Sequence, residues 1–128
     1  MFIPKARPKP QKSVYRERSV PAFRRWIKTL QCSVKGCPNA DIDPAHVRCG
    51  LPHGAQKGGT GIKPHDAWII PLCREHHDEQ HAGELTFAIK SQIDPVALAE
   101  TLWAAWLKST DAGRKWSQAH ATPPAEQP

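Results

Sequence analysis

The chain has 128 residues and a formal net charge of +6, which suits one small basic domain that needs a further source of stability. No segment approaches the roughly 18 apolar residues of a membrane span, and the N-terminus has no apolar signal region. We therefore expect a cytoplasmic protein with reduced cysteines, whose charge favours nucleic acid over membrane as a partner.

Residues 1–20 are predicted to form a disordered basic arm, because prolines interrupt a run of lysines and arginines there. This arm is either a phosphate-contacting segment or a solvated tail, and the sequence leaves both open. Residues 21–30 predict a first helix. Arg24 and Arg25 are expected on its outer face, toward solvent or phosphate, opposite apolar residues at helical spacing: Phe23, Trp26, Ile27 and Leu30.

The cysteines then suggest a zinc site. Cys32 and Cys37 flank Gly36, a residue that tolerates the left-handed turn of a metal knuckle. Cys73 and His76 are separated by two residues, which is a tight ligand spacing, and they complete a tetrahedral set of three thiolates and one imidazole. Cys49 is expected to be a loop or buried thiol, or else a replacement ligand if this set is wrong.

Two strands are predicted between the zinc knuckles, over residues 43–48 and 67–72, and they can pair with each other. The connection over residues 49–64 is rich in glycine, and loops of this length are usually functional. Lys57 and Lys63 on this loop are candidate contacts to a nucleic-acid backbone.

A helix after Cys73 would place His77 and His81 one turn apart on one face, where they can share a second metal ion. Helices are also predicted over residues 84–92 and after Asp94. The first of these is expected to turn Leu85, Ala88 and Ile89 inward, and the second presents an apolar stripe whose tryptophans pack in the core. Residues 110–128 are predicted to be a flexible tail.

This order of elements resembles the HNH (ββα-metal) nuclease superfamily: a histidine-bearing strand, a long loop, a second strand and a histidine-bearing helix, clamped by knuckles. The match covers residues 32–81. The segments Gly58–Asp66 and Ile70–His81 look like the Ref-like, RecA-dependent nucleases of phages and related prophage families. The resemblance implies a small α+β, treble-clef-like core over residues 21–109 with a C-terminal helical extension.

The resemblance also assigns roles. It implies hydrolysis of DNA phosphodiester bonds, with His46 as general base and a magnesium or manganese ion at His77 and His81. A RecA-type recombinase filament is an implied partner. Arg48 lies close to the proposed base, where it is either a phosphate clamp or a surface cation.

The chain departs from the superfamily at two positions. Ala45 replaces a common metal ligand, and no asparagine stands before Cys73, where Asp66 is the nearest polar residue. Asp66 either binds the metal or orients the imidazole of His46. The chain is thus interpreted as a metal-dependent endonuclease, or as a non-catalytic, zinc-stabilised nucleic-acid-binding module. A weaker third possibility is an interaction module that docks through the tryptophan helix.

Overall fold

The computed structural model describes residues 19–52 and 64–120, and these form the small α+β domain that the sequence predicts. No helix in the described ranges combines the length and the apolar character needed to cross a membrane. The elements, in chain order, are α2 (Pro21–Ile27), β1 (Ile42–His46), the short 3-10 helix η2 (Asp66–Trp68), β2 (Ile69–Cys73), α3 (Arg74–Ala82), α4 (Glu84–Ser91), α5 (Pro95–Ser109) and α6 (Asp111–Ala119).

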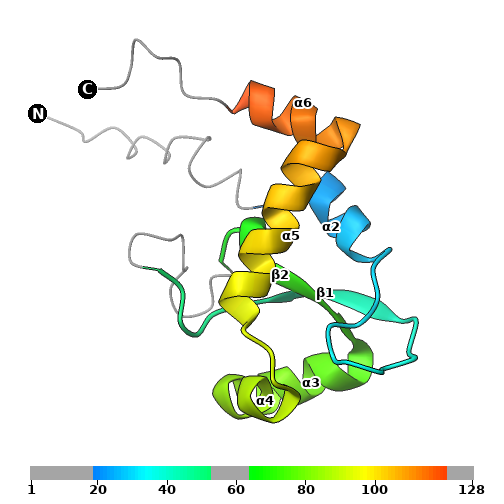
Figure 1. Ribbon diagram of the computed structural model, residues 1–128, viewed down its shortest axis with the longest axis vertical. Coiled ribbons are helices and arrows are strands. Elements are labelled where there is room, and N and C mark those ends of the chain that lie inside the picture. Colours follow the sequence, from blue (N-terminus) through cyan, green and yellow to red (C-terminus); the bar gives the residue numbers. More distant parts are fainter. Residues whose placement is uncertain (1–18, 53–63, 121–128) are drawn as a thin grey trace, which may run out of the picture.

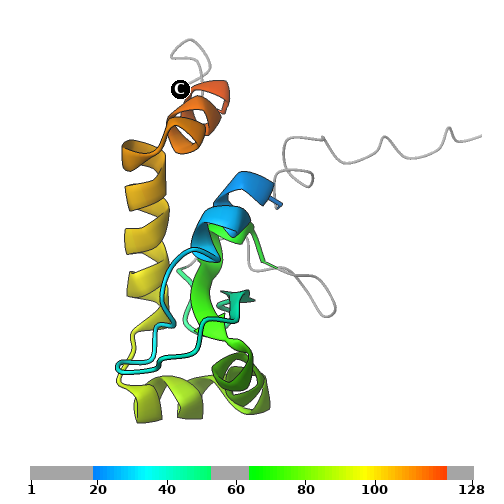
Figure 2. The same ribbon diagram turned by 90° about the vertical axis from the view of Figure 1, so that its right-hand side faces the viewer.

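A two-stranded antiparallel sheet lies at the centre of the domain, with β1 paired to β2. The register places Ile42 opposite Cys73 at one end and His46 opposite Ile69 at the other. Helices α3 and α4 lie below this sheet, α5 runs alongside it, and α2 and α6 lie above (Figures 1 and 2). The sheet therefore separates a cysteine-bearing end from a histidine-bearing end while fixing both to the same frame.

Apolar clusters cover both faces of the sheet, which explains why every residue of β2 is buried. Adjacent strand residues point to opposite faces, so Ile70 joins one cluster while Ile69 joins the other. Phe87 and Ala99 complete the first cluster. The second contains Val20, Phe23, Ile27 and Trp106, with Trp26, Trp103 and Trp116 packed against it. The prediction that the tryptophans of α5 pack in the core is confirmed for Trp106, which is 1% exposed, whereas Trp103 is half-buried against the second cluster.

Local sequence signals correctly predict the start of α5 and the left-handed turn at Gly36. The carboxylate of Asp94 accepts a hydrogen bond from the amide of Ala97 at 3.1 Å and caps α5, which has Pro95 in its first turn. Gly36 adopts the left-handed conformation, with φ of 80°. Both predictions rested on short-range backbone requirements, and both are confirmed.

The predicted boundaries of the domain are wrong at both ends. Val20 was assigned to the disordered arm, yet it is 2% exposed, and its amide donates to Asp66. The tail predicted from residue 110 instead contains α6, because Thr110 caps a helix by accepting from the amide of Gly113. A Cβ atom at Gly113 would collide with the carbonyl of Trp106, so close packing on α5 holds α6 in place.

The prediction for α4 is also wrong. Leu85 and Ile89, expected to face inward, are 66% and 70% exposed, and the buried residue of this helix is Phe87. The aromatic ring of Phe87 takes the place in the core that the helical pattern had assigned to the aliphatic residues, packing in the cluster with Ala99. An apolar stripe on α4, formed by Leu85 and Ile89, thus faces solvent.

Candidate functional site

The four predicted zinc ligands come together at the end of the sheet. Their donor atoms lie within 4.8 Å of one another, in the group Cys32, Cys37, Cys73 and His76. A tetrahedral zinc ion with bonds of about 2.3 Å to sulfur and about 2.0 Å to nitrogen separates its ligand atoms by roughly 3.5–3.8 Å. The sulfurs of Cys37 and Cys73 are 3.8 Å apart, and Cys32 Sγ lies 3.5 Å from His76 Nδ1. The residues therefore fit a metal ion such as zinc.

The surroundings of Cys73 favour its thiolate form. Burial raises the pKa of Cys73, but hydrogen bonds from the Asn39 side chain, from the amide of His76 and from the neighbouring thiols lower it to about 7. The pKa of Cys37 is raised, since burial and the thiols of Cys73 and Cys32 outweigh its bond to the Asn39 backbone. The pKa shifts therefore favour the cation-binding thiolate form at Cys73 more than at Cys37.

His46 lies at the opposite end of β1 and is paired with a buried carboxylate. Its Nε2 atom is 2.9 Å from Asp66 Oδ1, and Asp66 is 2% exposed. The amide of Val20 donates to the other carboxylate oxygen, Oδ2, at 2.7 Å. Nη1 of Arg24 lies 3.3 Å from Oδ1. Although burial raises the pKa of Asp66, the hydrogen bonds from His46 and Val20 and the charge of Arg24 leave it below its usual value. Asp66 is therefore ionised at neutral pH and accepts a hydrogen bond from His46 Nε2.

Two further histidines are aligned by a carboxylate on β1. His77 Nδ1 is 3.0 Å from Asp43 Oδ2, and Asp43 is also paired with Arg74. His77 Nε2 then lies 3.1 Å from His81 Nε2. Two ligands at about 2.1 Å from one ion and at right angles to each other are about 3.0 Å apart, so this spacing fits neighbouring ligands of a cation. A direct hydrogen bond between the two rings fits the same distance.

A small hollow of about 120 Å³ brings the two histidine groups together. We call it the histidine hollow; it is lined by His46, Arg48, Gln80, His81 and Glu84. Buried Gln80 donates to the carbonyl of His46 at 3.2 Å, and the carboxylate of Glu84 accepts from the amides of Arg48 and Cys49. Helices α3 and α4 thereby fix His46 and the chain that follows it.

The structure brings together some of the predicted site residues and separates others. Asp66 contacts His46 and not the His77–His81 pair, which matches the orienting alternative rather than the metal-ligand alternative. Arg25 lines a shallow hollow beside α2 together with Arg24 and Lys28. Cys49 is exposed and outside the cysteine cluster. The two loop lysines, Lys57 and Lys63, lie outside the described residues.

Asp43 and Gln80 are among the residues of the site that sequence reasoning missed. Asp43 precedes Pro44 in a segment interpreted only as the start of a strand, and its partner His77 is 34 positions away. For Gln80 a signal was available: it follows His76 by four residues and precedes His81, so it lies on the inner side of the same helix. A polar residue at a helix position facing the core indicates a specific hydrogen-bond partner.

Comparisons with known proteins give a family and no activity. The model of DUF968, described as a protein of unknown function, matches residues 4–107. The uncharacterized protein YdfU of Escherichia coli (strain K12) is 44% identical over 74 residues, covering 56% of this chain. The match covers 19% of YdfU, so the chain spans about a fifth of that relative. No solved structure matches the chain significantly.

Proposed function

Because the chain belongs to the DUF968 family, whose function is unknown, we propose from its own residues that it is a metal-dependent DNA endonuclease of the HNH type. The observation that carries the proposal is the histidine hollow, which is lined both by His46, paired with Asp66, and by His81 of the His77–His81 pair. A general base and a cation-binding pair side by side are the groups that phosphodiester hydrolysis requires.

In this proposal the Cys32, Cys37, Cys73 and His76 group holds a structural zinc ion. A closed set of four protein ligands is typical of structural zinc, whereas a catalytic zinc site keeps an open position. The zinc would join the knuckle before β1 to the start of α3. This is the role that makes so small a domain stable.

His46 acts as the general base. Because ionised Asp66 only accepts hydrogen bonds, His46 carries its hydrogen on Nε2 and keeps Nδ1 as the basic nitrogen. A water molecule attacks phosphorus and gives its proton to His46, and the bond from phosphorus to the 3′ oxygen breaks. The leaving 3′ oxygen takes a proton from solvent, so the products are a 5′-phosphate and a 3′-hydroxyl. The contact from Gln80 to the carbonyl of His46 keeps the base in position.

His77 and His81 would hold the catalytic divalent ion, which supplies Lewis-acid stabilisation to the phosphate and the leaving oxygen. Asp43 accepts from Nδ1 of His77 and so leaves Nε2 available as the ligand atom. Imidazole nitrogens suit transition ions better than magnesium, so manganese is favoured over magnesium here. Arg48, which lines the hollow, would contact the phosphate.

A second candidate function is a zinc-stabilised nucleic-acid-binding module without catalysis. Ala45 favours it, because this buried position offers no ligand where many members of the HNH superfamily have one. Under this alternative the +6 charge and the cations beside α2 bind nucleic acid, and the histidine hollow is inert.

A plasmid-nicking assay separates the two candidates. Wild type, His46→Ala and His120→Ala are compared with magnesium, manganese, nickel or zinc, each with and without RecA filaments on single-stranded DNA, since the resemblance implies a recombinase partner. His120 is a matched control, because it stacks on Trp116 at the end of α6, at the opposite end of the molecule from α3 (Figure 1).

We expect nicking by wild type and His120→Ala, and a loss of about 10²–10⁴-fold in His46→Ala with its zinc content unchanged. Equal rates for wild type and His46→Ala would exclude His46 as the base. DNA binding without cleavage under every ion, with and without the filament, would establish the non-catalytic module instead.

A further inference from the structure

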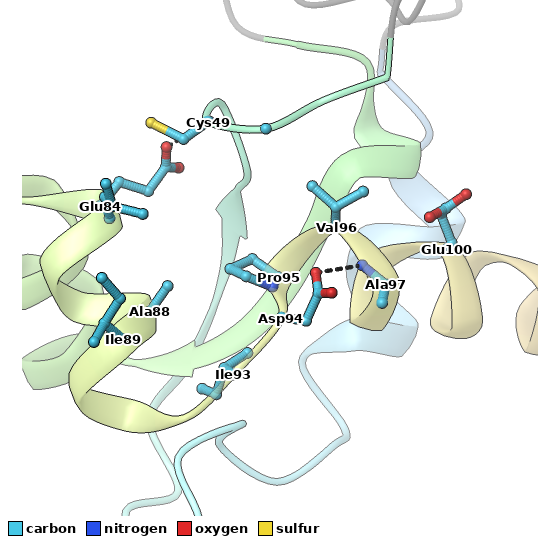
Figure 3. A pocket seen from close by; sticks show the side chains of 12 residues that line it. Cys49, Glu84, Ala88, Ile89, Ile93, Asp94, Pro95, Val96, Ala97 and Glu100 are labelled. Atoms are coloured by element: carbon cyan, nitrogen blue, oxygen red, sulfur yellow. Dashed lines mark hydrogen bonds between the residues drawn. The ribbon is translucent and has the colours of Figure 1, made fainter.

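A large apolar groove lies beside the histidine hollow and plays no part in the proposed chemistry. Its volume is about 570 Å³, and its walls are the outer face of α4 and the start of α5. Figure 3 shows Ala88 and Ile89 on one side, Ile93 at the base and Val96 on the other, with Cys49 at the rim.

The most exposed large apolar residues in the described part of the chain belong to this groove. Leu85 and Ile89 are 66% and 70% exposed, one turn apart on α4, and both line it. Each would gain by leaving water, since burial of such a side chain contributes about 1.5–3 kcal/mol. An apolar stripe that no other part of the described chain covers marks a surface that another molecule covers.

The charge of the groove restricts what can cover it. Among the residues that the structure describes, its lining contains three acidic residues, Glu84, Asp94 and Glu100, and no lysine, arginine or histidine. In a chain with a net charge of +6, this is a distinct acidic patch. Glu84 and Asp94 each accept backbone hydrogen bonds, but a carboxylate has about four acceptor sites and keeps its charge. Nucleic acid would be repelled here.

We propose that this groove binds an amphipathic helix of another protein, with an apolar face and lysine or arginine residues along its edges. Apolar side chains spaced at i, i+3, i+4 and i+7 would lie between α4 and α5, in the manner of a helix held in a groove. The basic residues of the bound helix would face Glu84 on α4 and Glu100 on α5. The proposal does not depend on nuclease activity.

The probe is a fluorescein-labelled 18-residue helical peptide with leucines on one face and lysines elsewhere. Two matched peptides test its parts: one replaces the lysines with glutamates and the other replaces the leucines with serines. Fluorescence anisotropy with the full-length, zinc-loaded protein should show the leucine–lysine peptide binding at least tenfold more tightly than either matched peptide.

Variants locate the binding. Combined Leu85→Ser and Ile89→Ser should weaken the leucine–lysine peptide at least tenfold without unfolding the protein, because both side chains are exposed. Glu100→Lys should weaken it at least threefold. Asp78→Lys makes the same charge change at an exposed position of α3 outside the groove and should stay within twofold of wild type.

Unchanged affinity in the double-serine variant, or equal affinity for the lysine and glutamate peptides, would overturn the proposal. Light scattering after size exclusion tests the rival occupant. A dimer of the wild type that the double-serine variant dissociates would assign the groove to a second copy of this chain and would likewise overturn it. A failed nicking assay would leave the peptide result unaffected.

Discussion

Replacing Cys73 by serine should unfold the domain, because this residue joins the proposed zinc ion to three parts of the chain. Cys73 is completely buried and ends β2, and its sulfur accepts hydrogen bonds from Asn39 and from the amide of His76 at the start of α3. Its own amide donates to the sulfur of Cys32. Loss of the thiolate therefore removes a zinc ligand and loosens the junction of sheet, knuckle and helix together.

The magnitude follows from the number of ligands. Zinc bound by four protein ligands contributes about 10–16 kcal/mol in small zinc domains, while whole domains are stable by only about 5–15 kcal/mol. The free-energy cost of removing the zinc ion with a chelator should therefore exceed the whole free energy of unfolding of the domain. Cys73→Ser keeps three ligands but replaces a buried thiol whose pKa is lowered to about 7, so we expect most of the binding free energy to be lost as well.

Circular dichroism and elemental analysis measure both effects. Wild type should contain one equivalent of zinc and melt cooperatively, whereas Cys73→Ser and chelator-treated wild type should show no cooperative melt. Cys49→Ser is the matched control, because this thiol is exposed and outside the cluster, and its melting temperature should stay near that of wild type. A zinc-free Cys73→Ser protein that melts like wild type would refute the ligand set.

Two further predictions concern the carboxylates of the histidine site. Asp66→Asn should lower stability by about 1–3 kcal/mol in urea titrations and slow nicking, because His46 and Val20 lose a charged acceptor. Since folding lowers the pKa of Asp66 from 3.8, its contribution is present above that pH and is lost as the pH falls through the folded value; the wild type should therefore lose stability in this acid range more than Asp66→Asn. Asp43→Asn should weaken manganese binding at His77 by about 10–100-fold, measured by electron paramagnetic resonance, with the zinc content unchanged. Unaltered manganese affinity would show that Asp43 serves only to pair with Arg74.

Features governed by neighbouring residues were predictable from the sequence. The two-residue spacing of Cys73 and His76 gave one half of the metal cluster, and the pair of cysteines around Gly36 gave the other. The caps and proline that begin α5 act within one turn, so they were also recognisable. The alignment of His77 with His81 required only the period of a helix.

Features that depend on which surfaces meet required the tertiary structure. Phe87 enters the core in place of Leu85 and Ile89, and nothing in the helical pattern of α4 indicates which side faces the sheet. Asp43 reaches His77 across 34 residues, and Asp66 reaches His46 across 20. The sequence thus determined the ligand types and the local elements, because spacing along the chain controls those. Only the contacts of β1 with α3 and η2 decided which carboxylate serves which histidine, because these segments are far apart in the chain. Only the way α4 packs on the core decided which apolar side chains remain exposed.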